Sequence, residues 1–245
     1  MNISTNHSRT IGILGGMGPQ ASVEFYRLLM EKCVRDYGAV NNDDYPEVII
    51  DSIPVPDFIS SLKSLSVARV MLADRIDRLA SFGVGRIGIA CNTAHLLLDD
   101  LRRASPVPVV SIMEEVARIV HHKKFRRVGL FASPITYRSR LFENAIVDTV
   151  DVVTPDLSVQ EGIDSIIRKV IAGQEPALLK SEALSILTPF VQIQRLDAVI
   201  LGCTELPLVI PTTDVLVPLI STLDVLADCM LAFCYSRRKT HERAS

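Results

Sequence analysis

Short apolar runs, often β-branched, alternate along the chain with longer segments whose apolar residues recur at helical spacing. The strand-like runs are residues 11–14, 48–53, 87–90, 107–112, 128–131, 150–154 and 198–201, with 216–220 as the weakest. The helical patterns between them cover residues 21–35, 66–82, 93–103, 112–121, 136–147, 159–172 and 175–194. Because the strands are apolar on both faces, the alternation predicts an α/β fold with parallel sheets covered by helices.

The two halves of the chain repeat the same order of strands and turns. In each half a strand first leads into a turn of small residues and then a helix, at residues 9–22 and 126–139. Later in each half a strand ends in a cysteine that threonine follows closely, at Cys91 and Cys203. We therefore expect two pseudo-symmetric parallel-sheet α/β domains facing each other across a cleft. The first comprises residues 1–105 and 214–245, and the second comprises residues 106–213.

Composition narrows the class of protein. With 245 residues, 48% of them hydrophobic, the chain has enough apolar material for one large or two small cores. Its formal net charge is −2 and it has no long basic run, so nothing favours a nucleic-acid partner. Residues 1–9 are polar, unlike a secretory signal, and no apolar stretch reaches the roughly 18–20 residues that span a bilayer. The five cysteines show no Cys-x-x-Cys spacing, so we expect a cytoplasmic protein with reduced thiols, no metal site and no membrane partner.

The glycine-rich loop at residues 15–21 raises the question of nucleotide binding. Gly16-x-Gly18-x-x-Ala21 satisfies the loose dinucleotide-binding pattern, with Pro19 at the first position of the predicted helix. A dinucleotide site also needs an acidic residue at the end of a second strand about 20 residues further on. Here the next strand-like run ends near Asp51, too far along the chain. We therefore interpret the loop as the wall of a pocket rather than a cradle for phosphates.

Two cysteines lie where chemistry is expected in such a fold. Cys91 and Cys203 each follow a strand and precede a helix, and the carboxyl ends of parallel strands are where ligands bind. Helix N-termini favour a thiolate, so this placement predicts thiol pKa values lowered toward neutrality. A thiolate and a thiol on opposite sides of one substrate carbon suit an inversion in which one takes a proton and the other returns one. The other three cysteines, Cys33, Cys229 and Cys234, fall in apolar helical patterns and are interpreted as packing residues.

Polar side chains next to these cysteines suit a carboxylate ligand. Hydroxyl and amide donors at helix N-termini form anion sites, and the same residues also serve as ordinary helix caps. The side chains are those of Asn92, Thr93, Ser133, Thr136 and Thr204. His95 and Glu205 are candidates to orient a catalytic group or relay a proton, with a supporting or packing role as the alternative.

These residues resemble the PLP-independent aspartate/glutamate racemase superfamily, and most closely its aspartate racemase branch. The matching segments are GILGGMGP (12–19), IPVPD (53–57), CNTAH (91–95), FASPIT (131–136) and LGCTELPLVI (201–210), in family order across nearly the whole chain. The resemblance implies two racemase-type domains, no cofactor, a small amino-acid substrate and a homodimer. It implies Cys91 and Cys203 as the catalytic acid/base pair. It also implies that Asn92, Thr93, Thr136 and Thr204 bind the substrate, and that Gly16 and Met17 line the pocket.

Some positions set this chain apart within the superfamily. Glutamate racemases carry Asp-Ser-Gly in the first loop and a histidine after the second Cys-Thr, where this chain has Gly15-Gly16-Met17 and Glu205. Aspartate racemases often have an arginine at the position of Phe58 and a lysine at that of Ile171, and either cation would bind a side-chain carboxylate. The candidate replacements are Lys63, Arg69, Arg138 and Lys169.

The sequence leaves three alternatives to an aspartate racemase-like enzyme. One is a related isomerase, of the maleate isomerase or hydantoin racemase type. Another is a paralogue that binds a small carboxylate without catalysis. The third is a redox sensor in which the two thiols form a disulfide. Exchange of the α-proton of a free amino acid with solvent would separate the racemase from all three.

Overall fold

The strands form two separate parallel sheets in the computed structural model, which describes residues 9–56, 62–147, 149–211 and 215–236. The first sheet has the order β2-β1-β3 and the second the order β5-β4-β6-β7. Their bounds are β1 (Ile11–Gly15), β2 (Val48–Ser52), β3 (Arg86–Ile89), β4 (Arg127–Ala132), β5 (Asp151–Val153), β6 (Ala198–Gly202) and β7 (Leu219–Ser221). Every strand pair in both sheets is parallel, which confirms the predicted α/β class.

Helices follow almost every strand, as the alternation predicts. The α-helices are α1 (Pro19–Tyr37), α2 (Leu65–Ser81), α3 (Leu98–Ala104), α4 (Ile112–His122), α5 (Pro134–Arg138), α6 (Leu141–Ala145), α7 (Leu157–Ile171), α8 (Pro176–Gln194), α9 (Leu206–Val209) and α10 (Thr222–Tyr235). Short 3₁₀ turns are η1 (Asn42–Asp44), η2 (Leu62–Ser64) and η3 (Thr93–Leu97). The predicted helix at residues 136–147 is two short helices, because Arg140 between them has a left-handed backbone with φ of 53°.

The strand predicted at residues 107–112 is wrong. Only Val109 bridges to Ile87 of β3, and α4 begins at Ile112. Pro106 and Pro108 explain the difference, because proline has no N–H to donate to a strand ladder. The segment still runs beside β3, since Pro108 accepts a hydrogen bond of 2.9 Å from the Ile87 amide.

The repeat between the halves is visible in the order of the strands. β1, β2 and β3 occupy the same relative places in the first sheet as β4, β5 and β6 in the second. The Val109 bridge beside β3 matches β7 beside β6, and a serine caps the helix that follows in each case. Ser111 Oγ accepts from the Glu114 amide at the start of α4, and Ser221 Oγ accepts from the Asp224 amide at the start of α10.

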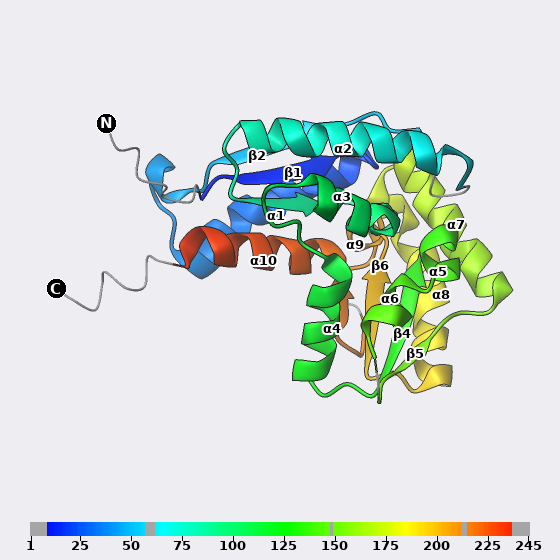
Figure 1. The fold of residues 1–245 in the computed structure, drawn as a ribbon. Helices are drawn as coiled ribbons and strands as arrows, with labels where there is room; N and C mark the ends of the chain where they lie inside the picture. The colour runs from blue at the N-terminus through cyan, green and yellow to red at the C-terminus, as the bar shows by residue number, and fades with distance from the viewer. Residues whose placement is uncertain (1–8, 57–61, 148, 212–214, 237–245) are drawn as a thin grey trace, which may run out of the picture.

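The helix that follows each of these two segments packs against the other half of the chain. α10 leaves the second sheet and packs against α1 and β3 of the first half, whereas α4 leaves the first sheet and packs against α6 and α10 (Figure 1). The predicted boundaries place residues 106–213 in the second domain and 214–245 in the first. In the structure, however, Val109 still lies beside the first sheet and β7 still belongs to the second. The crossing between halves therefore takes place at the two helices rather than at the segments before them.

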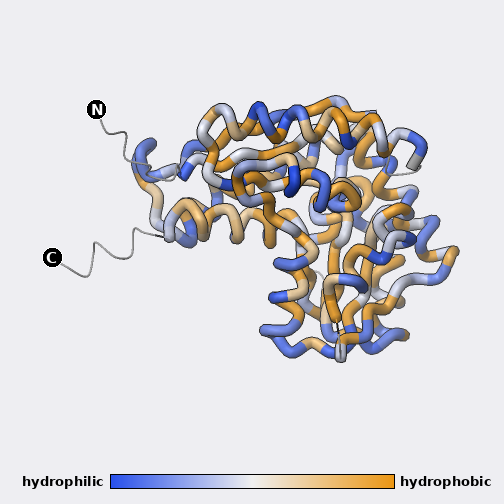
Figure 2. The backbone as a smooth tube through the Cα atoms, viewed as in Figure 1, coloured by the Kyte–Doolittle hydropathy of each residue, from blue (hydrophilic) through white to orange (hydrophobic). Residues whose placement is uncertain are grey.

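Three apolar clusters fill the spaces between sheets and helices, and in Figure 2 the strands are mainly hydrophobic while the exposed helix turns are hydrophilic. The largest cluster is continuous between the halves, from Phe25 of α1 through Leu226 of α10 to Leu130 of β4. A second lies between β4, β6 and helices α7 and α8, and a third lies between the first sheet and α2. The shared cluster fixes the halves to each other at one side of the sheets.

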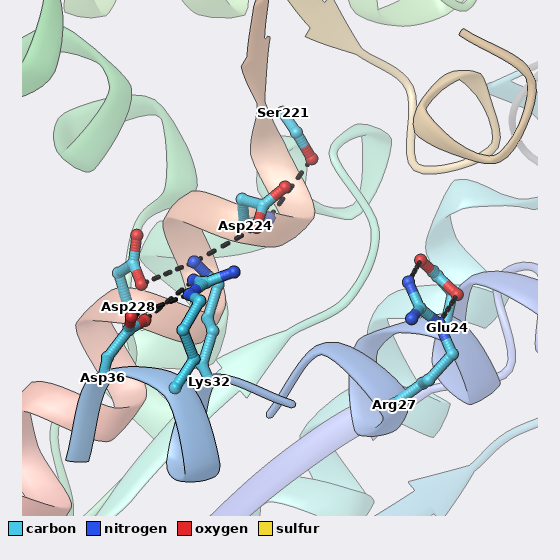
Figure 3. A network of polar contacts seen from close by, with 8 residues as sticks. Glu24, Arg27, Lys32, Asp36, Ser221, Asp224 and Asp228 are labelled. Carbon is cyan, nitrogen blue, oxygen red and sulfur yellow. Dashed lines mark hydrogen bonds and ion pairs between the residues drawn. The ribbon is translucent and has the colours of Figure 1, made fainter. Parts of the chain in front are cut away.

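A buried lysine reinforces the seam between α1 and α10. The Lys32 ammonium lies 3.1 Å from Asp224 Oδ1 and 2.8 Å from Asp228 Oδ1, and Figure 3 shows the three side chains converging from the two helices. Burying an unpaired charge would be costly, and the two carboxylates remove most of that cost. The ion pairs thereby anchor α10 to α1.

Candidate functional site

The two cysteines lie at equivalent strand ends. Cys91 follows β3 and Cys203 follows β6, and each strand is the neighbour of the first strand of its half. Cys91 belongs to the apolar cluster under α2, and Cys203 to the one under α7 and α8. Their exposed fractions are 3% and 6%, so water has little access to either thiol.

Glu205 connects the second cysteine to the first glycine loop. The Cys203 thiol donates to Glu205 Oε2 at 2.9 Å, and the Thr204 hydroxyl donates to the same oxygen at 3.0 Å. A Cβ placed on Gly18 would lie 3.2 Å from the other oxygen, Oε1. Oε1 is buried and has no hydrogen-bond partner in the described part of the chain, and the whole residue is only 1% exposed. The carboxylate therefore lies between the Cys203 turn and the loop of the other half.

The pKa values of both thiols are raised, contrary to the lowering that the sequence predicts. Burial raises the pKa of the Cys91 thiol to about 12, and the charge of Glu205 adds to this, while backbone amides of Ala94 and Thr93 act in the opposite direction. Burial also raises the pKa of Cys203 well above its usual value, with further contributions from Glu205 and Cys91. Desolvation outweighs the helix N-terminus here because both thiols are almost fully enclosed. Glu205 thus acts on both thiols, and Cys91 also acts on Cys203.

Three hydroxyls from the two halves form a closed cluster. Thr93 Oγ1 lies 3.1 Å from Ser133 Oγ and 2.9 Å from Thr136 Oγ1, and the Ser133 hydroxyl donates to Thr136 Oγ1 at 3.0 Å. Thr93 belongs to η3 after Cys91, whereas the other two belong to the turn between β4 and α5. The structure thus brings these predicted site residues together across the two sheets.

Asn92 is held by the first residue of α10, which in turn is bonded to β6. Its Nδ2 donates to Thr222 Oγ1 at 2.9 Å, and that hydroxyl donates to the Leu201 carbonyl of β6 at 3.0 Å. This orientation leaves Asn92 Oδ1 buried and without a described partner. Asn92 is therefore placed to receive an N–H donor.

His95 is fixed as a supporting residue beneath Cys91. Its Nε2 accepts from the Ile112 amide at 3.1 Å, so Nδ1 carries the proton and donates to the Cys91 carbonyl at 2.9 Å. Burial lowers the pKa of His95 to about 4, which keeps the ring neutral near pH 7. With both nitrogens occupied by backbone groups, the ring positions the Cys91 turn and has no position left for relaying a proton.

Gly16 has a conformational reason to be glycine. Its φ is 89°, and a Cβ at this position would lie 2.4 Å from the Ile53 amide nitrogen. Its own amide donates to Ser22 Oγ of α1 at 2.9 Å, and Met17 next to it is 6% exposed. The loop is thus packed closely against the chain after β2.

None of the cations considered as replacements has a buried side chain. Lys63, Arg69 and Arg138 have exposed side chains, and Lys169 on α7 is 2.8 Å from Glu182 of α8. Ile171 does lie at the site, with its Cγ1 3.8 Å from a Cβ placed on Gly18. Phe58 lies outside the described residues.

Three glutamine and threonine residues at the site were missed from the sequence. The first is Thr222, the first residue of α10, which directly follows β7. The second is Gln160 of α7, which donates to the Ala132 carbonyl at 2.9 Å beside the hydroxyl cluster. The third is Gln20 of α1, which donates to the Ile171 carbonyl at 3.3 Å. A polar residue on the buried face of the helical pattern was the available signal for Gln160.

Groups outside this site give no second catalytic centre among the described residues. Cys33 and Cys234 are core residues, and the half-buried Cys229 thiol donates to Glu115 at 3.4 Å. No set of three or more His, Cys, Asp or Glu side chains in the described ranges is arranged to hold a metal ion. No helix within those ranges is long and apolar enough to cross a membrane.

Known protein families and sequences include relatives of this chain. The family model described as Asp/Glu/hydantoin racemase matches residues 14–230, which include both cysteine turns. The broad specificity amino-acid racemase RacX of Bacillus subtilis is 28% identical over 218 residues, covering 89% of this chain and 94% of its own. A glutamate racemase from a Parafrankia strain is 33% identical over 144 residues, but covers 58% of this chain and 50% of its own.

Solved structures agree with the fold. The aspartate racemase of Picrophilus torridus has a TM-score of 0.78 at 25% identity, with coverage of 92% of this chain and 94% of its own. An aspartate racemase homologue from Pyrococcus horikoshii has a TM-score of 0.77 at 27% identity and coverage of 92% and 99%. The Francisella tularensis glutamate racemase, at 19% identity and a TM-score of 0.66, shares the fold.

Proposed function

The chain belongs to the Asp/Glu/hydantoin racemase family, and we propose that it inverts the α-carbon of a free amino acid with Cys91 and Cys203 as the two acid/base groups. The observation that carries this proposal is the pair of enclosed thiols at equivalent strand ends, both influenced by one carboxylate, Glu205. No cofactor is required by this chemistry, because the groups that take and return the proton belong to the chain.

The reaction moves two protons in opposite senses. One cysteine, as thiolate, takes the α-proton from one face and becomes a thiol as the C–H bond breaks. The other cysteine, as thiol, gives its proton to the carbanion from the opposite face and becomes a thiolate. The product has the opposite configuration, the two cysteines have exchanged protonation states, and no electrons are gained or lost.

Glu205 is the group placed to prepare the thiolate. At neutral pH the raised pKa values keep both thiols protonated, so one proton must leave before the reaction begins. The Cys203 thiol already donates to Glu205 Oε2, which gives that proton a short route through the carboxylate and out of the site. A substrate ammonium near the same carboxylate and thiolate would then stabilise the charged state.

The remaining polar groups are suited to hold the amino acid. We assign the substrate carboxylate to the hydroxyl cluster of Thr93, Ser133 and Thr136, with Thr204 contributing at the second cysteine turn. Asn92 Oδ1 is assigned as an acceptor for the ammonium, because it is buried and has no partner among the residues described. The thiols are almost fully enclosed, so the site must open to admit substrate and close again for the reaction.

Aspartate is the reference substrate, because the resemblance points to the aspartate branch. The similarity to a relative named as a broad specificity racemase supports testing a wider set of amino acids. A homodimer in the cytoplasm is also expected from the resemblance, and light scattering coupled to size-exclusion chromatography would measure the oligomeric state.

The test is proton NMR of the purified protein in D2O with the L and D forms of aspartate, glutamate, asparagine, glutamine, serine and lysine. We expect the α-proton signal of at least one amino acid to disappear, with its other enantiomer found by chiral chromatography. Absence of exchange for every amino acid, with the thiols confirmed as reduced, would contradict the proposal. Exchange must persist in protein dialysed against a chelator without added cofactor.

A further inference from the structure

A chain of three buried groups connects the two cysteine turns through the first residue of α10. The Asn92 amide nitrogen Nδ2 donates to the Thr222 hydroxyl at 2.9 Å, and that hydroxyl donates to the Leu201 carbonyl at 3.0 Å. Asn92 directly follows Cys91, and Leu201 lies two residues before Cys203. Asn92 is 3% exposed and Thr222 is fully buried, so both bonds are shielded from water.

The direction of these two bonds is fixed by the Thr222 hydroxyl. A hydroxyl has one proton to donate, and a backbone carbonyl such as that of Leu201 can only accept. The proton of Thr222 is therefore committed to Leu201, and the hydroxyl meets Asn92 with a lone pair. If the Asn92 amide were rotated by half a turn, its oxygen and the Leu201 carbonyl would compete for the same proton. The amide consequently presents Nδ2 to Thr222 and turns Oδ1 away from it.

The surroundings of Asn92 leave this half-turn as the change that needs the least space. The residue has helical backbone angles, with φ of −68° and ψ of −45°, and its carbonyl accepts from the His95 amide at 3.0 Å. The side chain is enclosed, whereas the oxygen and the nitrogen of an amide are similar enough in size to exchange places. Thr222 is the group that opposes this exchange.

The orientation decides what Asn92 offers to a ligand. Oδ1 is buried and has no hydrogen-bond partner among the residues that the structure describes. A buried acceptor without a partner is costly, so it indicates that a ligand supplies the missing donor. An α-ammonium has only donors, whereas an α-hydroxyl can donate or accept. An amide that offers Oδ1 therefore favours an amino acid, and one that offers Nδ2 would disfavour the ammonium and tolerate the hydroxyl.

We propose that Thr222 is a positioning residue, which sets the orientation of the Asn92 amide and thereby the preference of the site for α-amino acids over α-hydroxy acids. This proposal rests on the proposed racemase activity, because it takes the α-ammonium of a bound amino acid to lie against Asn92. Thr222 acts through Asn92 and needs no contact with the substrate.

Substitutions at residue 222 separate the hydroxyl from its packing. Thr222→Val keeps the shape of the side chain and removes the acceptor that holds Asn92 Nδ2. Thr222→Ser keeps the hydroxyl and should keep the orientation of the amide. Ser221→Ala is the matched control, because it removes the hydroxyl that caps the same helix at the Asp224 amide and leaves both bonds of the chain in place.

The measurement is the ratio of the dissociation constants of an α-hydroxy acid and of the amino acid with the same side chain, by isothermal titration calorimetry on reduced, folded protein. The pair is formed from the amino acid whose α-proton exchanges fastest, or from malate and aspartate if none exchanges. Each compound is supplied as its racemate, so that turnover leaves the composition of the solution unchanged.

We expect Thr222→Val to lower the hydroxy-to-amino ratio about tenfold or more, because a hydrogen bond to a charged group is lost from the amino acid alone. Thr222→Ser and Ser221→Ala should keep the ratio within about threefold of wild type, since neither removes an acceptor from Asn92. A general loosening of the helix start would weaken both ligands alike and leave the ratio unchanged. An unchanged ratio in Thr222→Val, or an equally low ratio in Thr222→Ser, would overturn the proposal.

The racemase activity and the role of Thr222 fail in different ways. If no amino acid exchanges its α-proton, the racemase activity is contradicted, while the malate-to-aspartate ratio still reports on Thr222. If exchange occurs but Thr222→Val keeps the ratio of wild type, the racemase stands and Thr222 does not set the preference. Absence of both exchange and aspartate binding would contradict both.

Discussion

The Cys203 thiol donates to Glu205 Oε2 at 2.9 Å, while the second oxygen of the same carboxylate faces the Gly18 loop of the other half. One side chain thus connects a candidate catalytic thiol with the opposite wall of the site. It also raises the pKa values of Cys91 and Cys203, in addition to the larger effect of burial. This relationship predicts how the activity depends on pH.

We expect kcat/KM to rise with pH from 7 to at least 9, because one thiol must lose its proton and both pKa values are raised. In Glu205→Gln the negative charge is lost while the size is kept, so the thiol pKa values fall and the rising limb moves to lower pH. The maximal rate falls as well, by roughly 10²–10⁴-fold, because the variant lacks the carboxylate that conducts the thiol proton out of the site. The measurement is a pH profile of solvent exchange for both proteins, and a limb that stays in place would contradict the role of Glu205.

The buried His95 predicts a specific pH dependence of stability. Its pKa is about 4 in the folded protein and 6.5 as the reference value, so the unfolded chain binds a proton that the folded chain does not. The free energy of unfolding should therefore fall as pH drops from about 6.5 to about 4, by on the order of 3 kcal/mol from this residue. Above pH 6.5 the contribution is complete and constant.

Denaturant unfolding of wild type and His95→Asn at several pH values measures this effect. The variant is less stable at pH 7, because it loses the ring's bonds to the Cys91 carbonyl and the Ile112 amide. Its loss of stability toward pH 4 should be smaller than that of wild type. Parallel curves for the two proteins would show that His95 is not the titrating group.

The hydroxyl cluster predicts a binding defect. Thr136→Val keeps the shape of the side chain but removes the hydroxyl that contacts Thr93 and Ser133. We expect KM to rise about 10- to 100-fold, because a hydrogen bond to a charged group contributes roughly 1.5–3 kcal/mol, with a smaller change in kcat. Ser185→Ala, which removes an exposed hydroxyl of α8, is the matched control and should leave KM unchanged. A fall in kcat alone would argue against carboxylate binding here.

The sequence predicts the parallel α/β class and the repeated halves, because both depend on local periodicity and on motifs read in order. It wrongly predicts a strand at residues 107–112, where two prolines prevent an apolar run from joining the sheet. It also misses the direction of the thiol pKa shifts. The helix N-terminus is visible in the sequence, whereas the enclosure of Cys91 and Cys203 results from packing between distant segments and outweighs it.

The residues of the candidate site also divide into those that the sequence predicts and those that it does not. Thr93, Ser133 and Thr136 are recognisable because they adjoin strand ends in both halves. Thr222 and Gln20 are not, because their roles depend on bonds to Asn92 and to the Ile171 carbonyl, far away in the chain. Contacts of this kind have no local signature, so they become visible only in three dimensions.

The most direct measurement of the two-cysteine account is α-proton exchange in D2O by Cys91→Ala and Cys203→Ala, each supplied separately with the L and D forms of the best substrate. We predict that both variants lose racemisation by several orders of magnitude, and that any exchange left in one variant is confined to one enantiomer and in the other variant to its mirror image. Cys229→Ala, which changes a thiol outside the site, should racemise like wild type. Near wild-type racemisation by either site variant would contradict the central claim.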